Sequence, residues 1–338
     1  MVFCIIAFCL GVDANAALFG SKHSREYRKL RDEAEKAIKV QNLDLAEDLL
    51  LKALVPARQY GENDGRYVTA LREVVDLLTF RKKYTQANPL AAQMVSSALK
   101  RYTTNSIEYA SALYEHGDVF LGLRDFQTAE QRFRVAEALA RSQTHAYSVP
   151  VGYCLGGTAR ALVGQGRIIE ALPLFSKALD LMGRTRTDWQ MHDIGTPFAG
   201  VQEAVFKPRF QDVAELTYDQ VMALQRLRRW EDAKVALEKL RKLITLRKGK
   251  NHSMHVPVLI QLAINQDVMD EIKEAENYYL EAVRIAKSAK LSKEGQIYLL
   301  ANFYRFYFNI ERVKDAEQLK QQLLKLGVAE SALVKLLQ

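Results

Sequence analysis

The sequence has few cysteines and only one short apolar run near its start. Three of its 338 residues are cysteine, at Cys4, Cys9 and Cys154. The apolar run covers residues 2–12, which is shorter than the about 20 residues that a membrane-spanning helix needs. The catalytic signatures HExxH and GxSxG are also missing. These absences favour a chain without a disulfide framework, without a transmembrane span after leader removal and without a recognisable catalytic motif.

The first sixteen residues resemble a cleavable secretory leader. The uncharged run Val2 to Val12 is followed by Ala14, Asn15 and Ala16, small residues of the kind found before a cleavage point. Removal of residues 1–16 would leave Cys154 alone, and one cysteine cannot form an internal disulfide. We therefore expect an exported protein, periplasmic or extracellular. The alternative is an uncleaved tail that associates with a membrane.

The charge balance is moderately basic. The chain carries 48 Lys and Arg against 40 Asp and Glu, a net charge of +8, with 49% apolar residues. Such a surface can simply keep a globular protein soluble. It can also attract acidic peptides, anionic lipid or a cell-wall polymer.

An alanine returns along the chain at an almost fixed interval. The gaps between successive members are 41, 42, 42, 62, 42 and 41 residues. These anchor alanines are Ala46, Ala87, Ala129, Ala171, Ala233, Ala275 and Ala316. A period of this length predicts a stack of helical repeats that contact only their neighbours. The one long gap equals a repeat of 42 plus an insertion of about 20 residues.

The residues around each anchor predict two helices per repeat. Apolar residues recur four and seven positions after the alanine, as in Phe133 and Ala136 after Ala129, and these offsets share one helix face. A leucine sixteen positions before the anchor, such as Leu113, belongs to an earlier helix. Polar turns such as residues 123–125 and 164–167 separate the two helices. A small side chain at the crossing lets paired helices approach closely.

This pattern resembles the tetratricopeptide repeat (TPR), in the 42-residue form of kinesin light chains. Leu113, Gly117, Phe120, Phe126, Ala129, Phe133 and Ala136 follow the order of that family. Residues 274–282, EAENYYLEA, are close to the kinesin-light-chain phrase. The resemblance implies an all-α domain over residues 17–338, a right-handed superhelix of about seven helix-turn-helix units. Residues 329–338 would then form a C-terminal capping helix.

In the TPR family the first helix of each repeat lines a concave wall, which implies a candidate peptide-binding set. Its members are Tyr114, Tyr153, Arg160, Tyr218, Arg226, Tyr298 and Arg305. Tyrosine offers rigid contact area with a hydroxyl, and arginine offers a planar fork for carboxylates. We expect an extended protein segment with acidic character as the partner. Asp76 and Asp118 would project from the same wall, and the tyrosines could instead be packing residues.

The insertion, residues 183–208, is rich in apolar side chains, among them Trp189 and Phe198. Long loops in compact arrays are usually functional or disordered. It could patch a misfit between two repeats or act as a lid on the concave wall. An enzymatic or regulatory site at His192 and Asp193 is a further alternative.

The sequence thus favours an exported scaffold for protein–protein interaction that is not an enzyme. The main alternative is a structural factor of the cell envelope that acts through self-association. No cofactor or nucleic-acid partner is expected. His252 and His255 lack a carboxylate or cysteine cluster beside them, so no metal site is expected either.

Overall fold

The computed structural model describes residues 22–143, 149–183 and 210–336. In these ranges it contains 15 helices and no strand, so the predicted all-α repeat fold is confirmed. The helices are α1 (Lys22–Lys39), α2 (Leu43–Arg58), α3 (Gly65–Phe80), α4 (Tyr84–Tyr102), α5 (Ile107–Gly122), α6 (Phe126–Gln143), α7 (Val149–Gly164), α8 (Ile168–Gly183), α11 (Phe210–Arg226), α12 (Trp230–Lys248), α13 (His255–Val268), α14 (Ile272–Ser288), α15 (Lys293–Asn309), α16 (Val313–Lys325) and α17 (Glu330–Leu336).

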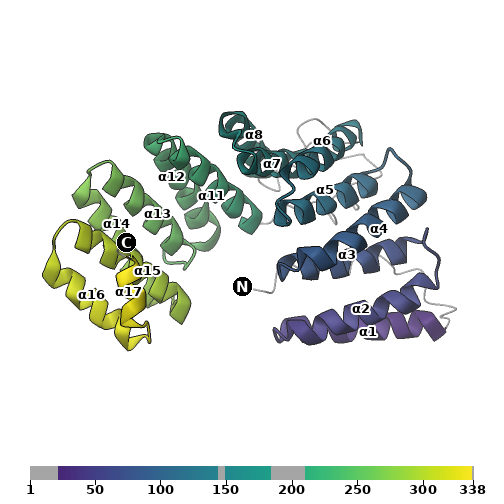
Figure 1. Cartoon of the computed structure of the whole chain (residues 1–338), viewed down its shortest axis with the longest axis horizontal. Helices are drawn as coiled ribbons and strands as arrows, with labels where there is room; N and C mark the ends of the chain where they lie inside the picture. Colours follow the sequence, from purple (N-terminus) through teal and green to yellow (C-terminus); the bar gives the residue numbers. More distant parts are fainter. Residues whose placement is uncertain (1–21, 144–148, 184–209, 337–338) are drawn as a thin grey trace. The chain divides into compact units, whose positions relative to one another are not determined.

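Within each compact unit of the chain, the helices form consecutive antiparallel pairs that stack one on the next (Figure 1). The chain divides into two compact units, residues 1–216 and 217–338. In each pair the first helix carries the leucine position and the second carries the anchor alanine. Because α8 ends at Gly183, the first residue of the expected insertion is helical. The rest of the insertion, with Trp189 and Phe198, lies outside the described residues, as does the expected leader.

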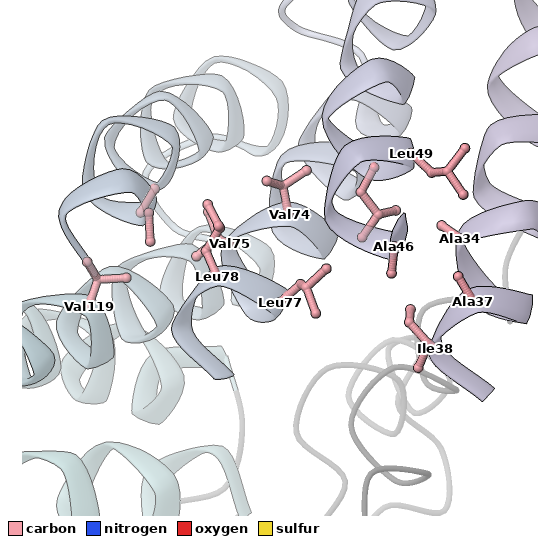
Figure 2. Close-up of a cluster of buried hydrophobic side chains, with 13 residues drawn as sticks. Ala34, Ala37, Ile38, Ala46, Leu49, Val74, Val75, Leu77, Leu78 and Val119 are labelled. Carbon is pink, nitrogen blue, oxygen red and sulfur yellow. The ribbon is translucent and has the colours of Figure 1, made fainter. Parts of the chain in front are cut away.

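All seven anchor alanines are buried, which confirms the packing role inferred from their period. Six of them have no exposed surface, and Ala316 is 4% exposed. Figure 2 shows the first of these contacts, where Ala46 of α2 lies between Ala34 and Ala37 of α1 and Leu77 of α3. Small residues from two neighbouring helices meet here, so the backbones can approach at the short end of helix-packing distances.

In two repeats an aromatic residue three positions before the anchor packs against a glycine of the next repeat. A Cβ built on Gly122 would lie 2.2 Å from the ring of Tyr84, and one on Gly164 would lie 2.4 Å from the ring of Phe126. Each ring therefore occupies the space that a side chain at the glycine of the next repeat would need. The last repeat has no successor, and its corresponding residue, Val313, is 74% exposed.

The C-terminal cap is smaller than the sequence suggested. Leu333 of α17 is 1% exposed and closes the core, but Val334 is 55% exposed and does not contribute. Lys320 stands where the repeat pattern has an aromatic residue, and its Nζ lies 2.7 Å from the Glu330 carboxylate of α17. The ion pair that Lys320 forms with Glu330 thus connects the capping helix α17 to α16 of the final repeat.

Every turn inside a repeat contains one residue in the left-handed conformation, five positions before the anchor. These residues are Gln41, Lys82, Arg124, Gly166, Arg228, Asp270 and Glu311, with φ between 57° and 81°. The next N–H donates to a carbonyl five residues back, as from Asp125 to Phe120 at 3.0 Å, which is the Schellman end of a helix. Asp125 also caps α6, since its carboxylate accepts the Thr128 N–H at 3.1 Å.

We expect Arg124→Gly to raise the free energy of unfolding by about 0.5–1 kcal/mol, since only glycine adopts this conformation without a steric cost. The converse change, Gly166→Ala, should lower it by about 1 kcal/mol. Urea unfolding followed by circular dichroism measures both. Opposite signs at these two equivalent turns are the expected outcome, and equal signs would contradict the assignment.

Ion pairs also join neighbouring repeats at the edge formed by these turns. A cation four positions before one anchor meets the glutamate that directly follows the previous anchor. The three pairs are Lys83–Glu47 at 2.7 Å, Arg167–Glu130 at 3.0 Å and Arg312–Glu276 at 2.7 Å. These three cations on the edge are therefore neutralised within the fold.

Candidate functional site: the first-helix faces

The candidate surface in each unit is the face of the first helices that flanks the buried leucine, called here the first-helix face. In the N-terminal repeats the side chains on this face form ion pairs between successive first helices. Arg31 of α1 donates to Glu73 of α3 at 2.9 Å, and Arg72 donates to Glu115 of α5 at 2.8 Å. Each arginine directly follows its leucine position, and each glutamate lies two residues after one. These residues fix the spacing of the helices.

At the arginine position of the third repeat stands Tyr114, and a tyrosine cluster replaces the ion pairs. The Tyr114 ring lies 5.8 Å from that of Tyr153 on α7, with a T-shaped geometry, and 5.4 Å from that of Phe133. The Tyr153 hydroxyl donates to the carboxylate of Asp212 in the first turn of α11. The structure thus brings together two of the predicted binding residues, both half-buried. They are packing residues at least in part, since their rings contact one another.

Asp118, one turn after Tyr114 on α5, is the acidic residue of this cluster. Burial raises the pKa of the Asp118 carboxyl to about 7, although the charge of Arg160 and a hydrogen bond from Tyr114 oppose that shift. Burial likewise raises the pKa of the Tyr114 hydroxyl well above its ordinary value. The predicted binding residue Arg160 therefore faces a carboxylate of its own fold.

Asp118 predicts a pH dependence of stability. The folded chain keeps the Asp118 proton up to about pH 7, whereas an unfolded aspartate releases it near pH 4. The folded state then binds more protons between these values, so this group's contribution to the free energy of unfolding falls as pH rises through that window. Asp118→Asn cannot ionise, so its stability relative to wild type should rise from pH 4 to pH 7.5.

Urea unfolding of both proteins at four pH values between 4.5 and 7.5 measures this difference. The exposed Asp32 of α1 supplies a control for the loss of a surface carboxylate, made as Asp32→Asn and measured at the same pH values. A pH profile of Asp118→Asn parallel to that of wild type would show that Asp118 is ionised throughout.

In the second unit the first-helix face is more open. Tyr298 of α15 is 49% exposed, and so is Met222 of α11. Arg226 and Arg305 are exposed as well, and neither makes an ion pair within the described part of this unit. The Tyr218 hydroxyl of α11 is buried without a hydrogen-bond partner. Burial, with a smaller contribution from Tyr298, raises the pKa of Tyr218. The four predicted residues of this unit thus lie on α11 and α15, two first helices with α13 between them in the repeat order.

His252, His255 and Cys154 take part in the packing and hydrogen bonding of the fold. His255 is 2% exposed, and its Nε2 lies 3.1 Å from the Gly249 carbonyl oxygen. The His252 Nδ1 accepts the Met254 N–H at 3.2 Å. Cys154 is fully buried on α7, and burial raises the pKa of its thiol. Within residues 22–143, 149–183 and 210–336 no three His, Cys, Asp or Glu side chains are grouped to hold a metal ion.

Two elements of the first-helix faces were not predicted, and only one of them could have been found from the repeat pattern. Asp212 lies next to the insertion, where the 42-residue spacing is lost, so nothing in the sequence assigns it to Tyr153. The Arg72–Glu115 pair connects residues 43 apart, and the repeat period itself would have suggested it. Among the helices that the structure describes, none is long and apolar enough to cross a membrane.

Comparison with known proteins supports the fold. No family model matches the sequence, and no curated protein matches it. A putative kinesin light chain of Podosopora anserina with TPR-like repeats is 14% identical, covering 68% of this chain and 99% of its own, with a TM-score of 0.50. Aspartyl phosphate phosphatase F from Bacillus subtilis is 12% identical, covering 92% of this chain and 85% of its own, also with a TM-score of 0.50. The chain therefore has the TPR-like repeat fold that its sequence resembles.

Proposed function

We propose that this chain is an exported, non-enzymatic scaffold that binds an extended segment of another protein on its first-helix faces. The observation that carries the proposal is the open face of the second unit. An exposed methionine and an exposed arginine lie there on α11, and an exposed tyrosine and a second exposed arginine lie on α15, two first helices with α13 between them in the repeat order. Large apolar and aromatic side chains grouped with arginine are typical of protein-binding surfaces.

The two units differ in what they would accept. In the first unit Arg160 faces Asp118, and Tyr153 is bonded to Asp212, so that face is rich in carboxylates. In the second unit Arg226 and Arg305 are exposed, while Asp267 lies close enough to Arg305 for the arginine to oppose the raised pKa of Asp267. An acidic segment therefore fits the second unit better than the first. Export rests on residues 1–16 alone.

A displayed library of random twelve-residue peptides, selected on the purified chain, tests the proposal. We expect selected peptides to be enriched in Asp and Glu, and we expect the triple variant Tyr298→Ala, Arg226→Ala and Arg305→Ala to bind them at least tenfold more weakly. The matched control replaces Leu280, Arg284 and Arg134 with alanine, since these are exposed on second helices.

Equal loss in the control would mean that the peptides do not bind the first-helix face. Unchanged binding by the triple variant would contradict the proposal in the same way. Recovery of the exported chain from the envelope fraction, with residues 1–16 removed, tests the second part, and an intact N-terminus in the cytoplasm would contradict it.

A further inference from the structure

A second surface lies at the opposite end of the second helices, where each repeat leads into the next. In the second unit these helices end in cations, with Arg247 and Lys248 in the last turn of α12, Lys287 in that of α14 and Lys325 in that of α16. Together with cations of the following turns they form what we call the basic edge. Its members are Arg247, Lys248, Lys250, Lys287, Lys290, Lys293 and Lys325, all exposed.

Contacts between repeats place these residues on one edge. Near the ends of α12 and α14, Arg241 donates to the Glu281 carboxylate at 2.8 Å, so the two helices run side by side. Lys293 follows the turn after α14, and Gly327 lies in the turn after α16. The Lys293 Nζ lies 3.6 Å from the point that a Cβ on Gly327 would occupy, so these two turns are close together. The repeat geometry therefore lines up three successive turns and their cations.

The basic edge is not neutralised by the fold. None of its seven cations makes an ion pair with another residue of the described ranges, whereas Lys83, Arg167 and Arg312 of the opposite edge are paired with glutamates. The equivalent turns of the first unit are also paired, as in Arg58–Glu62 at 2.7 Å and Arg141–Glu137 at 2.6 Å. Lys293 even occupies the first turn of α15, where the helix dipole disfavours a cation.

An apolar side chain projects from the same edge. Leu246, directly before Arg247, is 79% exposed, more than any other large apolar residue in the described part of the chain. Residues 246–255 and 286–296 contain no Phe, Tyr or Trp, the large rings on which bases stack in single-strand binders. Of the two histidines there, His255 is buried and the His252 Nδ1 accepts the Met254 N–H. Six of its seven cations are lysine, which binds as a point charge rather than as a planar fork. These features fit a diffuse anionic surface better than a nucleic acid.

We propose that the basic edge docks on a membrane surface of anionic phospholipid, with Leu246 entering the boundary between headgroups and acyl chains. Lysines near such a surface are attracted to its negative potential, and an inserted apolar residue adds a second contribution. The partner-binding first-helix faces are separate from this edge, so the membrane contact and segment binding can be lost independently.

Co-sedimentation of the full chain with vesicles tests the proposal. At 0.1 M NaCl we expect binding to phosphatidylcholine vesicles that contain 30% phosphatidylglycerol, and little binding to pure phosphatidylcholine. The quadruple variant Arg247→Gln, Lys248→Gln, Lys250→Gln and Lys287→Gln should reduce the partition coefficient about 1,000-fold. Leu246→Ser should reduce it about fivefold while leaving its salt dependence unchanged.

The control replaces four exposed lysines of the first unit, Lys29, Lys36, Lys52 and Lys82, with glutamine, so its net charge changes equally. It should retain binding within about threefold. An equal loss in the control would show that net charge, not the basic edge, governs binding. Equal binding to neutral and anionic vesicles would assign it to the apolar N-terminal run, and tighter binding to a 30-base-pair DNA duplex at the same salt would favour nucleic acid. Each of these results would overturn the proposal.

Discussion

Replacing Phe133 with alanine should lower the free energy of unfolding by about 3–5 kcal/mol, the range found for buried aromatic residues. The Phe133 ring has no exposed surface. A Cβ built on Gly117 of the same repeat would lie 2.7 Å from it, and one on Gly157 of the next repeat would lie 2.6 Å from it. The ring therefore fills space that two glycines leave open, and neither glycine has a side chain with which to refill it.

Urea unfolding followed by circular dichroism at 222 nm measures the Phe133→Ala effect. Val135, two residues later on α6 and 49% exposed, provides the control, because Val135→Ala should cost less than about 0.5 kcal/mol. The packing described for Phe133 would be wrong if the two variants lost similar stability.

Enlarging an anchor alanine should be the second most damaging change. Ala129→Leu inserts three carbons where Ala129 has no exposed surface, and it must either push α5 and α6 apart or distort side chains around it. Overpacking of this kind costs typically 1–3 kcal/mol and occasionally more. We expect about 3 kcal/mol, because the paired helices meet along their length and cannot yield at one point only.

The control for the anchor is Ala138→Leu, an exposed position on the same helix. Leucine and alanine have similar helix propensities, so this change should stay within about 0.5 kcal/mol of wild type. The comparison separates the crossing from the helix itself. If Ala129→Leu proved as mild as Ala138→Leu, the anchors would not set the distance between helices.

The repeat positions could be predicted from the sequence because they recur seven times. Burial at Ala46, Phe133 or Leu323 follows from spacing within a helix and needs no knowledge of distant contacts. The departures were harder to interpret. Lys320 replaces the aromatic residue of the repeat pattern, and only its contact with Glu330 of the neighbouring α17 explains that replacement. Val313 is exposed because no eighth pair covers it.

The turns show why a local feature can escape sequence analysis. Seven equivalent residues adopt positive φ, yet only one of them, Gly166, is a glycine. The others are residues with charged or amide side chains, such as Arg124 and Asp270, and these residue types do not by themselves predict a left-handed conformation. Hydrogen bonds of the helix end hold them there. The strain is small enough to be offset by the repeat packing on both sides.

The candidate surface was predicted in part. Periodicity places Tyr114, Tyr298 and Arg305 on first helices, and the structure confirms those helices. The periodicity does not predict that Arg160 faces the Asp118 carboxylate, because this contact joins two repeats whose polar residues differ. Polar residues on repeat faces vary independently of the apolar period, so only coordinates assign their partners.

Thiol protection tests the central claim, that seven periodic small residues lie at helix crossings, most directly. Each anchor alanine is replaced in turn by cysteine in a chain with Cys4→Ser and Cys9→Ser, and its reaction with a thiol reagent is timed under native conditions. The account predicts that all seven react at least 100-fold more slowly than a cysteine at exposed position 138 and become reactive only on unfolding. A single anchor cysteine that reacts as fast as the one at position 138 in the folded chain would contradict it.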